Sequence, residues 1–64
     1  MKYKYDPKTD ILILILGNGR LDFGEQSGNI IVHHDKVGLP LEIEFLEASK
    51  TAMEILSTII GDSS

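Results

Sequence analysis

The chain has 64 residues, of which ten are acidic and six basic, and it contains no cysteine. This composition excludes disulfides and thiolate zinc sites as means of stabilising so short a domain, and it leaves self-association as the usual third means. The basic residues are scattered, which argues against nucleic-acid binding through phosphate contacts. The start at Met1–Pro7 does not resemble a secretory signal, and we expect a single cytoplasmic domain over residues 1–64.

The first predicted element is a strand at Lys2–Tyr5, where lysine and tyrosine alternate. The next residues, Asp6–Thr9, predict a type I turn in which the aspartate bonds to nearby backbone and Pro7 fixes φ. Asp10 follows, and a second strand begins at once with the aliphatic run Ile11–Leu16. We expect the two strands to form an antiparallel hairpin.

The aliphatic run, Ile11–Leu16, is the strand around which the predicted fold is organised. Its six residues are too few to span a membrane, which takes about 20. Successive side chains of a strand point to opposite faces, so the isoleucines line one face and the leucines the other. Both faces must therefore be covered, because uncharged runs of this kind self-associate when they are exposed.

The segment after the aliphatic run carries turn residues. Gly17–Gly19 predicts a turn because asparagine and glycine tolerate positive φ. Arg20–Phe23 alternates polar and apolar residues and is expected to be a short return strand, whereas Gly24–Asn29 has little to bury and is expected to be a loop. In an alternative interpretation, the whole segment folds over one sheet face as a lid, using Leu21 and Phe23.

Two more strands are predicted at Ile30–His34 and Leu39–Leu46, joined by a turn in which Gly38 is left-handed and makes a bulge. Pro40 cannot donate to a strand ladder and is expected at an edge or beside the bulge. The register that this turn predicts pairs Ile30 with Glu44, Ile31 with Ile43, Val32 with Glu42 and His33 with Leu41. One face of this hairpin would then be apolar, and the other would mix aliphatic residues with glutamates.

A helix is predicted over Ala48–Ile60 because apolar residues recur there at spacings of three and four. Ser49 is the expected N-cap, Gly61 the expected C-terminal stop, and residues 62–64 a frayed tail. The expected fold is therefore α+β. It consists of an antiparallel sheet of four to five strands, a meander of hairpins, with one C-terminal helix packed on one face.

One helix can cover only one of two apolar sheet faces. We place its apolar stripe against Ile31, Leu41, Ile43 and Phe45, which leaves an apolar patch with a charged rim on the other face. Such a patch is typical of a protein interface, and a homodimer is expected. The predicted interface residues are Leu12, Leu14, Leu16, Ile30, Val32, Glu42 and Glu44.

Three stretches of the sequence resemble a known family. They are Tyr5-Asp6-Pro7-x-x-Asp10-x-Leu12, Asp35-x-x-Gly38, and Ile43-Glu44-Phe45-Leu46-Glu47-Ala48-Ser49. Together they are similar to the short prokaryotic proteins described as domain of unknown function 2283. The resemblance implies a small β-sheet with a C-terminal helix, no established activity, and an antitoxin-type role beside a small toxin-like partner. The chain departs from the family pattern at His33-His34, where members commonly have Asp-Tyr, and at Glu42, where they have glycine.

Residues that could carry chemistry are few. His33 and His34 are neighbours on a strand, so they project to opposite faces and cannot chelate one ion within a chain. Across a symmetric dimer, His34 could meet Glu42 and Glu44 in a metal site, although an ordinary surface histidine is the preferred interpretation. His33 is expected to be bonded to backbone at the edge of the core.

The preferred functional interpretation is a non-enzymatic protein-interaction module without a cofactor. Asp6 and Asp10 fit turn formation better than a pair of catalytic carboxylates. One alternative is an antitoxin-like component that binds a small toxin partner. Another is a metal-dependent enzyme that uses His34, Glu42 and Glu44. Neither nucleic acid nor a membrane is an expected partner.

Overall fold

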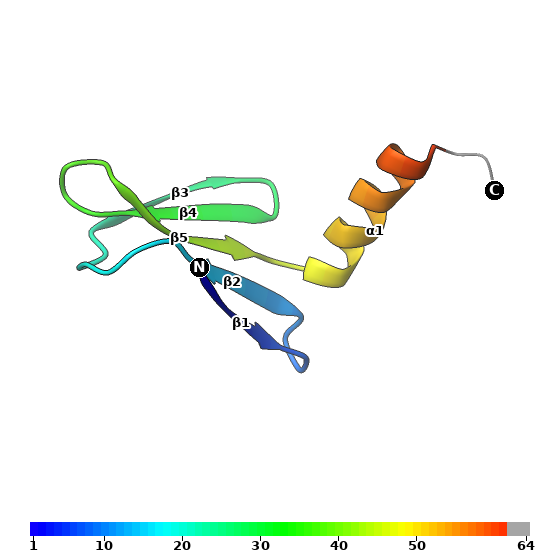
Figure 1. Ribbon diagram of the computed structural model, residues 1–64, viewed down its shortest axis with the longest axis horizontal. Coiled ribbons are helices and arrows are strands. Elements are labelled where there is room, and N and C mark those ends of the chain that lie inside the picture. The colour runs from blue at the N-terminus through cyan, green and yellow to red at the C-terminus, as the bar shows by residue number, and fades with distance from the viewer. Residues whose placement is uncertain (62–64) are drawn as a thin grey trace.

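The computed structural model describes residues 1–61 of the chain. In this range one helix follows a five-stranded antiparallel sheet, as the sequence predicts (Figure 1). The elements are β1 (Lys2–Asp6), β2 (Ile11–Ile15), β3 (Phe23–Ser27), β4 (Ile30–His34), β5 (Pro40–Phe45) and α1 (Ala48–Ile60). The α+β class is confirmed. The frayed tail expected at 62–64 lies outside the described residues.

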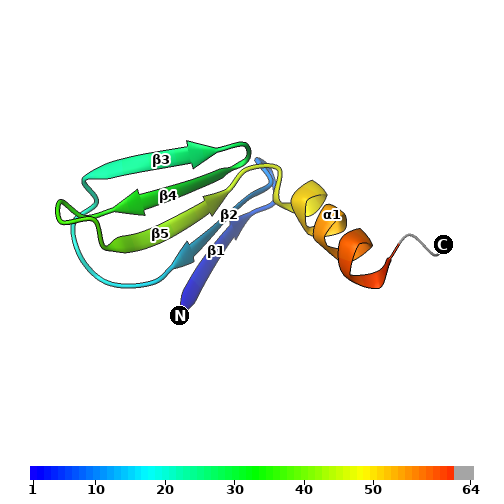
Figure 2. The same cartoon turned by 90° about the horizontal axis from the view of Figure 1, so that it is seen from above.

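The strand order across the sheet is β1-β2-β5-β4-β3. A hairpin of β1 and β2 lies beside a meander of β3, β4 and β5, and the pairing of β2 with β5 joins the two units (Figure 2). The aliphatic strand β2 therefore has a neighbour on both sides, while β1 and β3 form the edges. This order protects the backbone of the most aggregation-prone strand.

Both predicted turns are present, although the first is one residue longer than a type I turn, since the N–H of Asp10 bonds to the backbone oxygen of Asp6 at 2.8 Å. The Asp6 carboxylate accepts a hydrogen bond from the backbone N–H of Lys8 at 3.0 Å. In the second turn, the Asp35 carboxylate accepts from the N–H of Val37 at 2.9 Å, and Gly38 has φ 94°. In each turn, the aspartate carboxylate accepts a hydrogen bond from a backbone N–H that has no partner in the sheet.

The segment Gly24–Asn29 is not the loop that its composition predicts. Most of it belongs to β3, an exposed edge strand that pairs with β4 from Phe23 opposite His34 to Ser27 opposite Ile30. An edge strand needs only backbone hydrogen bonds to its neighbour, so its side chains can be polar and solvated. The sequence signal for this hairpin is the two-residue turn at Gly28-Asn29, where Gly28 has φ 57°.

The predicted register between β4 and β5 is correct only next to the turn. His34 faces Pro40, but Leu41 is an extra residue opposite the break between His33 and His34, and Val32 consequently faces Ile43. This β-bulge moves the rest of β5 by one position, and a shift of one position exchanges the two faces of a strand. Pro40 lies beside this bulge, which is at Leu41 and is not the one predicted at Gly38.

Because of the bulge, the sheet has one strongly apolar face and one mixed face. The leucine face consists of Tyr3, Tyr5, Leu12, Leu14, Leu16, Ile30, Val32, Ile43 and Phe45, and towards the β3 edge it also carries Phe23, Glu25 and His34. The isoleucine face consists of Ile11, Ile13, Ile15 and Ile31, with Lys2, Lys4, His33, Glu42 and Glu44 among them. The prediction that Glu42 and Glu44 share a face with the leucines is therefore wrong, because they lie beside Ile15 and Ile13 on the opposite face.

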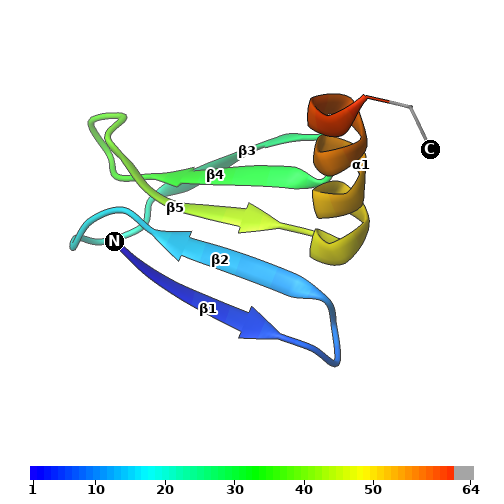
Figure 3. The same cartoon turned by 45° about the vertical axis from the view of Figure 1, so that its right-hand side comes forward.

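The helix does not pack on a face of the sheet, contrary to the prediction. It leaves the end of β5 and extends beyond the ends of the strands (Figures 1, 2 and 3). No residue of α1 is buried, and the molecule measures 45 × 24 × 21 Å. The reason is the short junction, in which Leu46 and a left-handed Glu47 with φ 48° are the only residues between β5 and α1. Within residues 1–61, no helix has both the length and the apolar character needed to cross a membrane.

The core of the single chain is very small. Among the described residues, Leu41 is the one buried hydrophobic side chain, with 2% of its surface exposed. It lies under the loop after β2, where Gly17 and Gly19 approach it so closely that a Cβ on Gly19 would come within 3.1 Å of its Cδ1. The loop therefore covers one end of the sheet, whereas Leu21 and Phe23 are each 42% exposed and form no lid over the leucine face.

Candidate interaction surface

The leucine face carries no charged side chain over β1, β2 and β5. Cross-strand neighbours there are aromatic or aliphatic, with Tyr5 beside Leu12 and Leu12 beside Phe45. The face is open to solvent in the single chain, since Tyr3 is 72% exposed and Ile30 is 37% exposed. A contiguous apolar surface of this kind marks a site of protein association.

The isoleucine face has a different composition. Ile13 lies between Lys4 of β1 and Glu44 of β5, and Ile15 lies in the same way between a lysine and a glutamate. The aliphatic stems of lysine and glutamate can lie along neighbouring isoleucines while their charged ends reach water. Such stems are available to cover apolar surface on this face, whereas the leucine face has none over β1, β2 and β5.

His33 belongs to the isoleucine face. Its Nε2 lies 3.1 Å from Oε1 of Glu44, so its partner is a carboxylate and not the backbone group that the sequence suggests. The one-residue shift at the bulge explains the difference, because it places His33 beside Glu42 and diagonally beside Glu44. Sequence reasoning missed this pair because it assumed an unbroken register.

His34 belongs to the opposite face, so it does not meet Glu42 or Glu44. Its ring stacks on Phe23 with centroids 4.8 Å apart, and its Nε2 lies 3.5 Å from Oε1 of Glu25. The cluster of His34, Glu42 and Glu44 that the metal hypothesis requires is therefore not formed within the chain. Among residues 1–61, no three histidine, aspartate or glutamate side chains converge to hold an ion.

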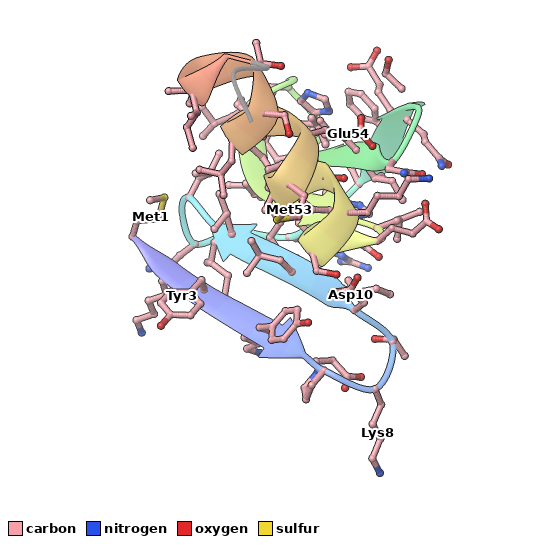
Figure 4. All side chains as sticks on the ribbon, turned by 90° about the vertical axis from the view of Figure 1, so that its right-hand side faces the viewer. Met1, Tyr3, Lys8, Asp10, Met53 and Glu54 are labelled. Atoms are coloured by element: carbon pink, nitrogen blue, oxygen red, sulfur yellow. The ribbon has the colours of Figure 1, made fainter. Side chains whose placement is uncertain are left out.

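Asp10 joins the first hairpin to the helix. Its carboxylate accepts hydrogen bonds from the Tyr5 hydroxyl at 2.7 Å and from the Ser49 hydroxyl at 2.6 Å. It also accepts from the backbone N–H of Ser49 at 3.1 Å, and its backbone oxygen accepts from the N–H of Ala48 at 2.8 Å. We call Tyr5, Asp10 and Ser49 the Asp10 latch; Figure 4 shows Asp10 at the foot of α1.

The Asp10 latch corrects the role predicted for Ser49. The helix begins at Ala48, and its N-cap is Glu47, whose side chain makes no capping hydrogen bond. Asp10, far away in the sequence, satisfies the first N–H groups of the helix instead and places an anion at the positive end of the helix dipole. The turn residues of the first hairpin thus act as the helix cap.

The junction before α1 is held from the other side as well. The backbone oxygen of Asn29 accepts from the N–H of Leu46 at 2.8 Å, and the Asn29 side-chain amide donates to the Glu47 carboxylate at 3.0 Å. One hairpin tip therefore holds the two-residue junction through Asn29, and the other holds the first two residues of α1 through Asp10. The direction in which α1 leaves the sheet is fixed by these contacts.

The Asp10 latch predicts a window of pH in which the helix is anchored. Hydrogen bonds from Ser49 and then Tyr5 lower the pKa of Asp10, and the bond to Asp10 raises the pKa of Tyr5 above 10.0. Asp10 therefore contributes stability at neutral pH that is lost as the pH falls through its lowered pKa. Tyr5 contributes stability that is complete below pH 10.0 and is lost as the pH rises through its raised pKa.

Circular dichroism of the helix against pH would check this expectation. The loss of helical signal at acid pH should be smaller in Asp10→Asn than in the unaltered chain. The loss at alkaline pH should be smaller in Tyr5→Phe. Profiles of both variants that coincide with that of the unaltered chain would contradict the role given to the latch.

Comparison with known proteins now gives the family. A family model described as "Protein of unknown function (DUF2283)" matches residues 2–49. The chain belongs to the DUF2283 family. The DUF2283 match includes all five strands and ends at Ser49, so it contains the whole Asp10 latch, while most of α1 lies beyond it. No curated protein and no solved structure matches the chain.

Proposed function

We propose that this DUF2283 protein is a non-enzymatic interaction module that self-associates through its leucine face. The observation that carries the proposal is the composition of that face, which is aliphatic and aromatic across β1, β2 and β5 and has no charge over these strands. Ionic groups lie at its margins, where Glu25 is near His34 on the β3 side and Asp10 bonds to the Tyr5 hydroxyl at the end of the first hairpin. An apolar centre with charge only at the margin is the usual anatomy of an interface.

The surface area of the chain supports the same proposal. The single chain exposes 5077 Å², whereas a compact protein of 7.1 kDa exposes about 4,100 Å². The excess is on the order of 1,000 Å², and each partner in a stable complex of standard size buries about 800 Å². One association with a second copy would therefore remove the excess.

The shortage of buried side chains leads to the same conclusion. A core whose one fully buried side chain is Leu41 supplies little of the hydrophobic free energy that a folded domain needs. Association adds burial, and a partner that binds only the folded form stabilises that form. Folding and self-association of this chain are therefore expected to be linked.

Paired substitutions on β2 test the proposed face. Leu14→Lys places a charge in the centre of the leucine face, and Ile13→Lys makes the same change one position along, on the isoleucine face. In sedimentation equilibrium at micromolar concentration, the unaltered chain and Ile13→Lys are expected to be dimeric and Leu14→Lys monomeric, because burying a lone charge is costly. A monomeric unaltered chain, or dissociation by Ile13→Lys alone, would refute the proposal.

A further inference from the structure

The helix presents a second uncovered apolar surface. The apolar stripe of α1 is formed by Ala52, Ile55, Leu56 and Ile59, which follow one another at spacings of three and four. Ile55 is 52% exposed and Ile59 is 75% exposed. A helix of 13 residues is marginal in water without packing, so this stripe needs a partner surface.

The helix cannot supply that partner surface from its own sheet. Its first residue is bonded to Asp10, and the junction before it is bonded to Asn29, so the two hairpin tips set its direction. Figures 1 and 2 show that α1 lies beyond the ends of the strands. In this arrangement no residue of α1 is buried against its own sheet.

We propose that α1 of one chain packs its apolar stripe on the leucine face of a second copy, which returns the same contact. This reciprocal helix exchange rests on the self-association proposed above and names the segment that occupies the face. In such a two-fold dimer, the apolar stripe of each chain covers the leucine face of the other, so both exposed surfaces of both chains are buried.

The two surfaces match in size and in charge. A helix of 13 residues is about 20 Å long, and a strand of five residues is about 17 Å long. The apolar stripe carries no charge, and Lys50 and Glu54 lie on other sides of the helix, so an uncharged stripe meets the part of the leucine face over β1, β2 and β5 that has no charged side chain. Stacking two sheets directly would cover the leucine faces and leave both helices exposed.

Cross-linking between chains tests the exchange. Because the chain has no native cysteine, the cross-linker reacts only with cysteines that are introduced. One full-length chain carries Leu14→Cys and another carries Ile59→Cys. Each is treated with a short bismaleimide cross-linker, first alone and then after the two are unfolded and refolded together. Helix exchange predicts a covalent dimer in the mixture at yields at least ten-fold above those of either chain alone.

Ser57→Cys is the matched control, because this position lies on the opposite side of α1 from Ile59. A mixture of Ser57→Cys with Leu14→Cys is expected to give no more covalent dimer than either chain alone. Sedimentation and circular dichroism of each variant establish that it is folded and dimeric before the cross-linker is added.

Each other result overturns the exchange. Covalent dimers from Leu14→Cys alone would show that sheets stack directly, and dimers from Ile59→Cys alone would show that helices pair. Equal yields with Ser57→Cys, or no product from variants that sediment as dimers, would also contradict it. Sheet stacking would leave the proposed association through the leucine face standing, helix pairing would leave only the dimer itself, and an unaltered chain that sediments as a monomer removes both proposals.

Discussion

Replacing Leu41 by alanine is expected to lower the free energy of unfolding by about 3 kcal/mol, within the range measured for large-to-small changes in cores. Leu41 is 2% exposed, and the glycines of the loop after β2 close over it. Its backbone oxygen also accepts from the N–H of Leu16 at 2.8 Å, so the main chain around it cannot easily move to fill a cavity. A single core of this size rarely supplies more than about 3–5 kcal/mol, so the substitution would remove most of it.

Urea unfolding followed by circular dichroism would measure this effect, at one fixed protein concentration because association contributes to stability. Leu39→Ala is the matched control, since this leucine lies two positions away and is 57% exposed. The control is expected to change the free energy of unfolding by less than about 0.5 kcal/mol. Equal losses in the two variants would mean that Leu41 does not form the core.

Replacing Asp10 by asparagine is expected to release α1 from the sheet. Asparagine tolerates the positive φ of 57° at this position, so the turn is kept while the anion is lost from the start of the helix. The neutral amide cannot accept from Tyr5 and Ser49 as strongly as the carboxylate does. Amide exchange in the first turns of α1 is expected to rise about ten-fold, as for the loss of an N-cap.

Asp6→Asn provides the control for this experiment. Asp6 lies in the same turn and loses the same charge, but its carboxylate bonds to the backbone N–H of Lys8 and not to the helix. Hydrogen exchange read by mass spectrometry should therefore show faster exchange in α1 for Asp10→Asn only. If both variants, or neither, loosened the helix, the anchoring role of Asp10 would be wrong.

The local patterns of the sequence predicted most elements correctly. The alternation at β1, the aliphatic run at β2 and the helical spacing over Ala48–Ile60 each reflect one element and its nearest turn. The strand β3 was missed because an exposed edge strand leaves no hydrophobic pattern to read. Its signal is confined to the short turn at Gly28-Asn29.

The features that depend on distant parts of the chain could not be predicted. The bulge at Leu41 shifts the register of β5, which moved Glu42 and Glu44 off the predicted interface while Leu12 and Leu14 stayed on the leucine face. The Asp10 latch joins Asp10 and Ser49, which are 39 positions apart. The local sequence around either residue gives no sign of this contact. Ser49 therefore looked like an ordinary cap.

The extra residue at Leu41 also keeps the two sides of the sheet chemically distinct. If the same chain formed a ladder without the bulge, the register that the turn favours would pair Val32 with Glu42 and Ile30 with Glu44. Glutamates would then stand among the leucines, and Ile43 and Phe45 would lie on the side of the lysines. The amphiphilic character of the sheet therefore depends on one residue that has no partner in β4.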